Sequence, residues 1–163
     1  MPVYSKVIEY EAIVEKLVHK KCNNILIIGC GGCMNESLAY DGDLCIFKDG
    51  NSLPAATVHE LNKLKEYLHK NNYSVETKYY DDINGFWCMR SIDCQDYDLS
   101  WNIQPDIILV LSCPSGQHAL SEELSGYTVI GITETLGGLS YCYRDVAGDR
   151  FIIKEKSRVL PIQ

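Results

Sequence analysis

The chain has 163 residues, 46% of them hydrophobic and 23% charged, with a formal net charge of −7. This length and composition predict one globular domain with its own core. The acidic balance, with no dense cluster of lysine and arginine, argues against a nucleic-acid surface. No apolar run approaches the roughly 18 residues of a membrane span, and residues 1–21 lack the apolar core of a signal peptide. We therefore expect a cytoplasmic protein with no nucleic-acid or membrane partner.

The first part of the chain predicts a helix, a buried strand and a loop. Apolar residues recur at close to helical spacing over 7–20, so we expect an N-terminal helix within residues 1–22 that packs on the rest. The continuous apolar run 25–28 predicts a strand buried on both faces. A glycine-rich loop follows over 29–43, in which residues 35–39 could form a turn of helix, and residues 44–47 form a short strand or belong to that loop.

The second part alternates helices and strands. Pro54 is well suited to begin a helix over 54–70, because its missing N–H costs nothing in the first turn. Residues 73–80 and 107–111 predict strands, separated by an irregular segment. Residues 117–124 predict a short helix and 127–132 a fourth strand.

The last residues carry weaker signals, which predict a glycine-containing loop over 133–140 and an edge strand over 150–153. Strands that alternate with helices build βαβ units around a parallel sheet. The expected fold is a single α/β domain over residues 1–163. We expect three layers, Rossmann-like or flavodoxin-like, with a parallel sheet of about four to five strands.

Cysteines follow two of the predicted strands. Cys30 and Cys33 come directly after the strand at 25–28, with two glycines between them that leave room for both sulfurs to face one centre. Cys113 follows the strand at 107–111. Because the carboxyl ends of parallel strands share one edge of a sheet, we expect these three thiols at one rim.

A fourth thiol can come from the irregular segment, which holds Cys88 and Cys94. Four thiolates suit a tetrahedral zinc ion or a [4Fe–4S] cluster, and the sequence leaves both open. Two other readings are a reactive dithiol of Cys30 and Cys33, and thiols that only pack. The remaining cysteines lack a loop motif and are interpreted as small buried apolar residues: Cys22, Cys45 and Cys142.

Other chemistries are less well supported. The glycines after the first strand do not complete a dinucleotide-binding pattern, because Met34 stands where the last glycine is needed. Ser115 and His118 resemble a nucleophile and base, but Ser115 is better placed as a helix N-cap. No convincing acid–base pair emerges, so the sequence favours a non-catalytic protein over an enzyme.

Two strings carry a resemblance to a known family: Ile-Leu-Ile-Ile-Gly-Cys30-Gly-Gly-Cys33 and Leu-Val-Leu-Ser-Cys113-Pro-Ser-Gly116-Gln117. They resemble the methylenetetrahydrofolate reductase C-terminal-like family, which includes a small iron–sulfur subunit that accompanies a flavin reductase. The resemblance covers roughly residues 24–140. It implies a [4Fe–4S] cluster bound by Cys30, Cys33, Cys113 and an intermediate cysteine, for which Cys88 matches best and Cys94 is the alternative.

The chain also departs from the family pattern. Ser37 stands where family members commonly carry a third cysteine, and Pro114 replaces a glycine. Residues 147–150 lack the thiols of the family's second cysteine-rich segment, so we expect one metal centre.

The first functional hypothesis is an electron-transfer or accessory subunit of a one-carbon system. Its protein partner would be a flavin-dependent reductase of methylenetetrahydrofolate or a corrinoid methyltransferase protein. The alternatives are a structural zinc-binding interaction module and a dithiol enzyme that uses Cys30 or Cys33.

Overall fold

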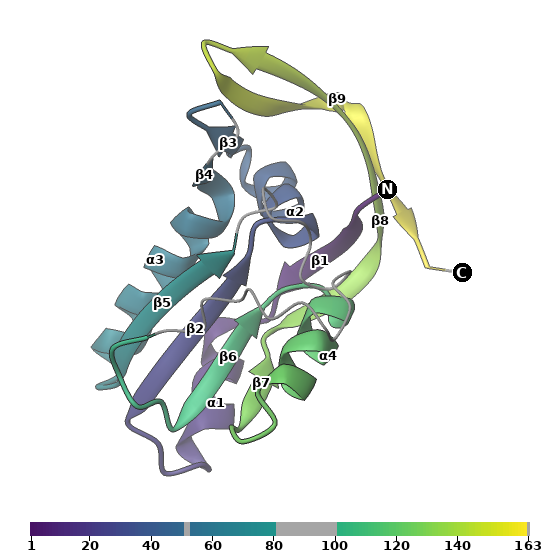
Figure 1. Cartoon of the computed structure of the whole chain (residues 1–163). Helices are drawn as coiled ribbons and strands as arrows, with labels where there is room; N and C mark the ends of the chain where they lie inside the picture. The colour runs from purple at the N-terminus through teal and green to yellow at the C-terminus, as the bar shows by residue number, and fades with distance from the viewer. Residues whose placement is uncertain (51–52, 81–100, 163) are drawn as a thin grey trace.

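The computed structural model describes residues 1–50, 53–80 and 101–162 (Figure 1). In chain order its elements are β1 (Val3–Val7), α1 (Tyr10–Val18), β2 (Asn24–Cys30), α2 (Cys33–Gly42), β3 (Cys45–Lys48), β4 (Leu53–Pro54), α3 (Ala55–Lys70), β5 (Ser74–Tyr80), β6 (Ile107–Leu111), α4 (Pro114–Glu123), β7 (Val129–Gly131), β8 (Thr133–Val146) and β9 (Asp149–Pro161). No helix among these residues is both long and apolar enough to cross a bilayer.

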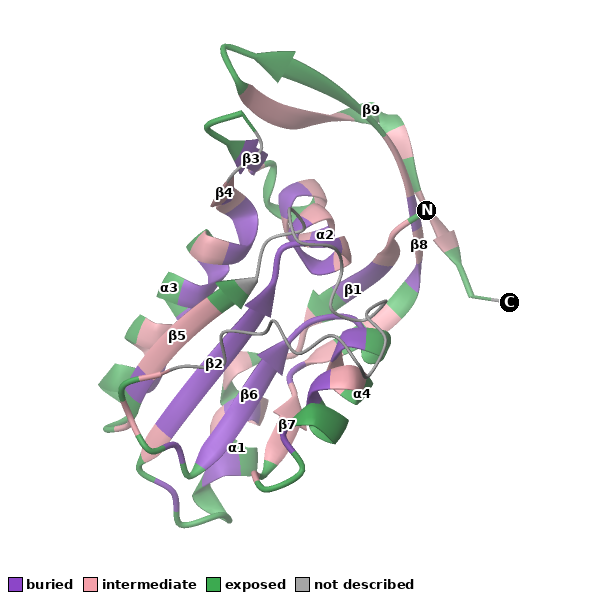
Figure 2. Ribbon diagram, viewed as in Figure 1, coloured by how far each residue is buried: buried purple, intermediate pink, exposed green. Residues whose placement is uncertain are grey.

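Four strands form a parallel sheet in the order β5-β2-β6-β7. The two central strands, β2 and β6, are almost wholly buried, as Figure 2 shows. Their continuous aliphatic sequences suit strands covered on both faces. Helices α1 and α3 lie side by side, since the ring of Tyr10 packs on Tyr67 with centroids 5.0 Å apart. The expected strands at 25–28, 73–80, 107–111 and 127–132 all belong to this sheet.

The expectation of a single three-layer parallel sheet is wrong. A separate antiparallel sheet of five strands, in the order β1-β8-β9-β3-β4, curls into a half-barrel. Its long strands β8 and β9 occupy the region expected to hold a loop over 133–140 and a short edge strand over 150–153. Many residues of β8 and β9 are exposed, and their sequences lack the continuous apolar runs that identify buried strands. The sequence therefore did not predict these two strands at their full length.

The two sheets meet at Ile132, which lies between β7 and β8. Its N–H donates to the carbonyl of Val110 in the parallel sheet (3.1 Å). Its own carbonyl accepts the N–H of Ile8, which follows β1 (3.0 Å). Ile132 is fully buried, so the chain passes from one sheet to the other inside the core.

The N-terminal segment begins as strand β1, and the helix expected from residue 7 begins at Tyr10.

Helix α3 packs tightly against the end of β2 at Gly29. A Cβ added to Gly29 would lie 2.6 Å from Thr57 Cγ2 and 2.9 Å from Leu61 Cδ1. Both side chains are buried, so neither can move aside freely. The glycine before Cys30 therefore allows the helix to approach the strand at the point where the thiols begin.

We expect Gly29→Ala to lower the free energy of unfolding by about 1–3 kcal/mol, because the added methyl overpacks this contact. Gly126→Ala is the matched control, since a Cβ there meets no atom within 4 Å. Urea denaturation of the two variants measures the difference. Equal stability of both would contradict the close approach of α3 to β2.

Candidate thiol site

The register between β2 and β6 places the first and last cysteines of the site side by side. Gly29 lies opposite Leu111 in the parallel ladder. The strands then end, so that Cys30 is the last residue of β2 and Cys113 comes two residues after β6. Both side chains are buried, at 4% exposure each. The prediction that the two strand ends bring these thiols to one rim is confirmed in the backbone.

Cys33 and Cys113 each lie at the start of a helix. Cys33 is the first residue of α2, and Cys113 is the N-cap of α4, with Pro114 in the first turn. Helix N-termini carry unpaired amides and a partial positive charge, which favour a thiolate. Ser115, expected as the N-cap, instead lies inside the first turn of α4.

The sulfurs of Cys33 and Cys113 interact directly. The hydrogen bond from Cys33, helped by the N–H groups of Gly116 and Ser115, lowers the pKa of Cys113 to about 6 against the opposing effect of burial. The two amides lower the pKa of Cys113 although the N-cap of α4 has no side-chain capping hydrogen bond. The same hydrogen bond, together with burial, raises the pKa of Cys33. At neutral pH the pair is therefore a Cys113 thiolate that accepts from the Cys33 thiol.

Cys30 ends β2, three residues before Cys33, and its groups are held differently. Its sulfur accepts the N–H of Gly32 at 3.4 Å, within the turn that leads into α2. Its carbonyl accepts the hydroxyl of Thr57 from α3 (2.8 Å). Within the described ranges, no three histidine, cysteine or acidic side chains are grouped closely enough to hold a metal ion. Cys88 and Cys94, predicted as the fourth ligand, lie outside those ranges.

Polar side chains, one buried and one half-buried, fix the backbone around the thiols. Asn35 of α2 is fully buried; its amide donates to the carbonyl of Ile46 (2.7 Å) and its oxygen accepts the N–H of Thr57 (2.8 Å). On the other side, Gln117 donates to the carbonyl of Ser112 (3.1 Å) and to the hydroxyl of Thr133 (2.8 Å). These residues position the loops that carry Cys30 and Cys113.

Ser37, which replaces a family cysteine, has a structural role. Its hydroxyl accepts the N–H of Ser5 (3.2 Å) and lies 3.2 Å from the carbonyl of Val3, so it satisfies the edge of β1. It also lies 2.8 Å from the carbonyl of Cys33, one helical turn earlier. Ser37 therefore joins the antiparallel sheet to the start of α2.

An acidic group also faces the site. Glu36 accepts a hydrogen bond from the hydroxyl of Tyr141 in β8, and its charge contributes to the raised pKa of Cys33. The sequence offered little sign of the roles of Asn35, Glu36 and Thr57, because their partners are distant along the chain. The sequence indicated Gln117 only as the last residue of the string that contains Cys113.

Three further cysteines of the described ranges are not partners of this pair: Cys22, Cys45 and Cys142. Cys22 and Cys45 are buried, as expected, and the Cys45 thiol hydrogen-bonds the carbonyl of Phe47 (2.8 Å). Cys142 was expected to be buried but is exposed on β8. His118, considered as a base, is exposed and lies 3.5 Å from Glu122.

Comparison of the chain with protein-family models, curated proteins and solved structures finds no match. The resemblance drawn from the two cysteine motifs therefore stays a prediction.

The hydrogen bond between the thiols has a measurable consequence for metal-free protein. Replacing Cys33 by alanine removes the donor and should raise the pKa of Cys113 from about 6 toward the ordinary value of 9.0. Cys33→Ser keeps a hydroxyl donor and should leave most of the shift in place. Thiolate absorbance at 240 nm, measured against pH, reports the pKa in both variants. If Cys33→Ala and Cys33→Ser titrate identically, the result would contradict the Cys33–Cys113 contact.

The same shift predicts how stability depends on pH. Between about pH 6 and 9, the unfolded chain still holds the Cys113 proton that the folded chain has released. Stability should therefore rise with pH across this window, and the rise should be smaller in Cys33→Ala. Above pH 9, the raised pKa of Cys33 works in the opposite direction, because its thiolate forms more easily in the unfolded chain.

Proposed function

We propose that the chain is a small accessory subunit that binds a [4Fe–4S] cluster through cysteine thiolates and serves electron transfer. The observation that carries the proposal is the contact between Cys33 and Cys113, which reach one point from loops after two adjacent buried strands. Metal and cluster ligands must be thiolates, and Cys113 is one at neutral pH without any metal. The two donors thus fit half of a four-thiolate set.

The chain's own residues would supply the rest of the set. Cys30 lies at the end of β2, next to the turn that carries Cys33. A ligand from the segment after β5, Cys88 or Cys94, would complete four. A bound [4Fe–4S] cluster supplies one-electron transfer, with a potential set by burial and by hydrogen bonds to its sulfurs. Here the N–H of Gly32 toward Cys30 and those of Ser115 and Gly116 near Cys113 are such donors.

The partner in this proposal comes from the resemblance of the two motifs. It would be a flavin-dependent reductase or a corrinoid methyltransferase protein of one-carbon metabolism, in the cytoplasm. The described residues support a binding role over catalysis in one respect. The groups near the thiols, such as Asn35 and Gln117, bond to backbone groups and hold loops in place.

A second candidate is a dithiol function, and one observation favours it. The thiolate of Cys113 and the thiol of Cys33 form a pair with separated pKa values, as a redox-active dithiol requires. This pair spans two loops, whereas the sequence pointed to Cys30 and Cys33. A structural zinc ion on the same cysteines is the third possibility.

Metal analysis of anaerobically purified protein separates these functions. We expect about four irons and four sulfides per chain, with broad visible absorption. Cys33→Ala and Cys113→Ala should lose the iron while keeping the far-UV spectrum of the parent. Cys142→Ser is the matched control and should keep it, because this side chain lies exposed on β8. The corresponding variants of Cys88 and Cys94 identify the fourth ligand.

Stoichiometric zinc in place of iron would support the structural zinc module. Protein with neither metal nor sulfide, whose Cys33 and Cys113 react as a dithiol, would overturn the cluster proposal in favour of the second candidate.

A further inference from the structure

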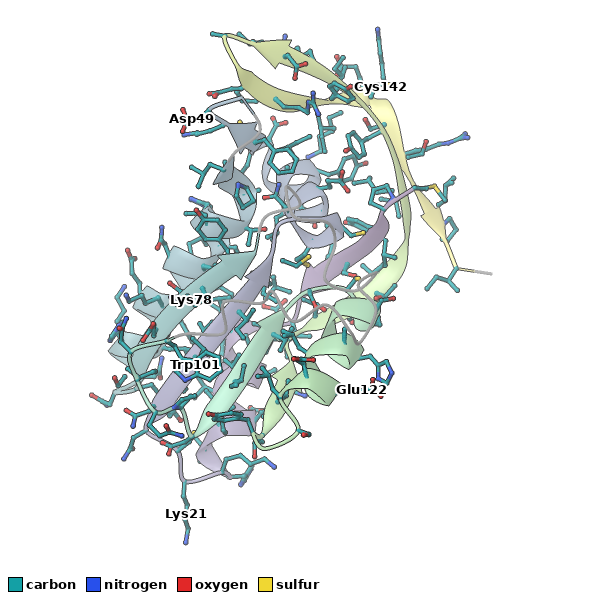
Figure 3. The ribbon with its side chains drawn as sticks, viewed as in Figure 1. Lys21, Asp49, Lys78, Trp101, Glu122 and Cys142 are labelled. Carbon is teal, nitrogen blue, oxygen red and sulfur yellow. The ribbon has the colours of Figure 1, made fainter. Side chains whose placement is uncertain are left out.

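The long hairpin of β8 and β9, which extends away from the parallel sheet in Figure 1, leaves regular pairing at one place. Ser140 lies opposite Arg158, but the next pair in the ladder is Cys142 with Ile153. Residues 154–157 therefore have no partner in β8 and bulge out of the hairpin, close to Cys142, which is labelled in Figure 3. A bulge re-aims side chains, and bulges are common beside active sites.

A serine side chain holds the bulge closed. The hydroxyl of Ser157 accepts the N–H of Cys142 (3.2 Å) and donates to the carbonyl of Ile153 (2.7 Å). Lys154 is anchored as well, because its ammonium group lies over the ring of Tyr40, 5.4 Å from the centroid. These contacts give the bulge a defined conformation.

A pocket of about 440 Å³ lies at the bulge. It is lined by Asp43, Arg144 and residues 152–156, and we call it the bulge pocket. Ile152 and Ile153 are half-buried and give the pocket an apolar part. Its volume falls within the range of about 300–1,000 Å³ that small-molecule sites occupy.

Three cations from two strands line the bulge pocket: Arg144 of β8, and Lys154 and Lys156 of β9. All three are exposed, and none of them forms an ion pair among the residues that the structure describes. Arg150 of the same hairpin, by contrast, pairs with Asp145 (2.9 Å). The charges of the pocket are therefore available to a ligand.

The charge of the hairpin differs from that of the rest of the chain. Residues 140–161 carry five basic and three acidic side chains, whereas the other residues carry ten basic and nineteen acidic ones. An acidic chain repels anions, and the positive hairpin is a place where this repulsion is offset.

We propose that the bulge pocket binds a small organic anion, whose phosphate or carboxylate group is held by Arg144, Lys154 and Lys156. The planar guanidinium of Arg144 suits two parallel hydrogen bonds to either group. The apolar part of the ligand would contact Ile152 and Ile153.

The acidic residues of the lining favour a small ligand. Asp43 and Glu155 contribute two carboxylates to the pocket. A polyanion such as nucleic acid would meet these carboxylates along its backbone, whereas a single anionic group can bind at the cations alone. No cysteine of the described ranges lines the pocket, so the proposal is independent of the thiol site.

Three aromatic probes of similar size test the proposal: phenyl phosphate, phthalate and the cation phenyltrimethylammonium. Each is titrated into the full chain at an ionic strength of about 0.15 M, and NMR spectra of the backbone amides report which residues respond. We expect saturable shifts at Arg144 and residues 152–157 with one or both anions, and the anion that binds identifies the preferred group. The cation should leave these residues unchanged. No saturable shift there with either anion, or an equal response to the cation, would refute the proposal.

Removing charge at the pocket should weaken the complex. Arg144→Gln with Lys156→Gln removes two cations, and we expect the dissociation constant of the bound anion to rise at least about tenfold. The matched control is Lys20→Gln with Lys21→Gln, which removes the same charge at exposed positions and should bind like the parent. Figure 3 shows Lys21 at the opposite end of the molecule from Cys142. Equal weakening in the two double variants would mean that the anion responds only to overall charge, and would contradict a site at the bulge.

A variant that keeps every charge tests the bulge itself. Ser157→Ala removes the hydroxyl that closes the bulge, so we expect weaker binding together with the far-UV spectrum of the parent. Ser121→Ala is the matched control, because its hydroxyl makes the equivalent bond to the carbonyl of Gln117 on α4 (2.8 Å) and lies outside the pocket. Unchanged binding by Ser157→Ala would show that the bulge does not build the site, and the proposal would fail.

Discussion

The hydrogen-bonded register between β2 and β6 is the constraint on which the thiol site depends. Both strands are buried on both faces, so neither can slip without exposing or misplacing its aliphatic side chains. Because Gly29 lies opposite Leu111, the pairing of β2 with β6 ends at the same level in both strands. A helix follows each strand, with Cys33 as the first residue of α2 and Cys113 as the N-cap of α4, and the two sulfurs meet there.

The antiparallel sheet supports this arrangement from the side. Ile132 connects it to the parallel sheet, and Ser37 satisfies the edge of β1 while contacting the carbonyl of Cys33. Asn35 and Gln117 hold the loops on either side of the thiols through bonds to backbone groups. The electrostatic state of Cys113 follows from the Cys33 thiol and the first amides of α4.

The sequence predicted the parallel sheet well, because strands such as 25–28 and 107–111 are continuous apolar runs with clear ends. It could not reveal the second sheet, since β1 pairs with β8 from the far end of the chain and β8 and β9 are largely exposed. The positions of Cys30, Cys33 and Cys113 at one rim followed from strand order. The specific contact of Cys33 with Cys113 did not, because it depends on where α2 and α4 begin. The functional interpretation still rests on cysteine motifs and this contact.

The most direct test of the central claim is mild oxidation of metal-free protein followed by disulfide mapping. If the two helix starts bring their sulfurs together as described, the first disulfide to form joins Cys33 to Cys113. A first disulfide between Cys30 and Cys33, within the Cys-Gly-Gly-Cys motif itself, would contradict the account.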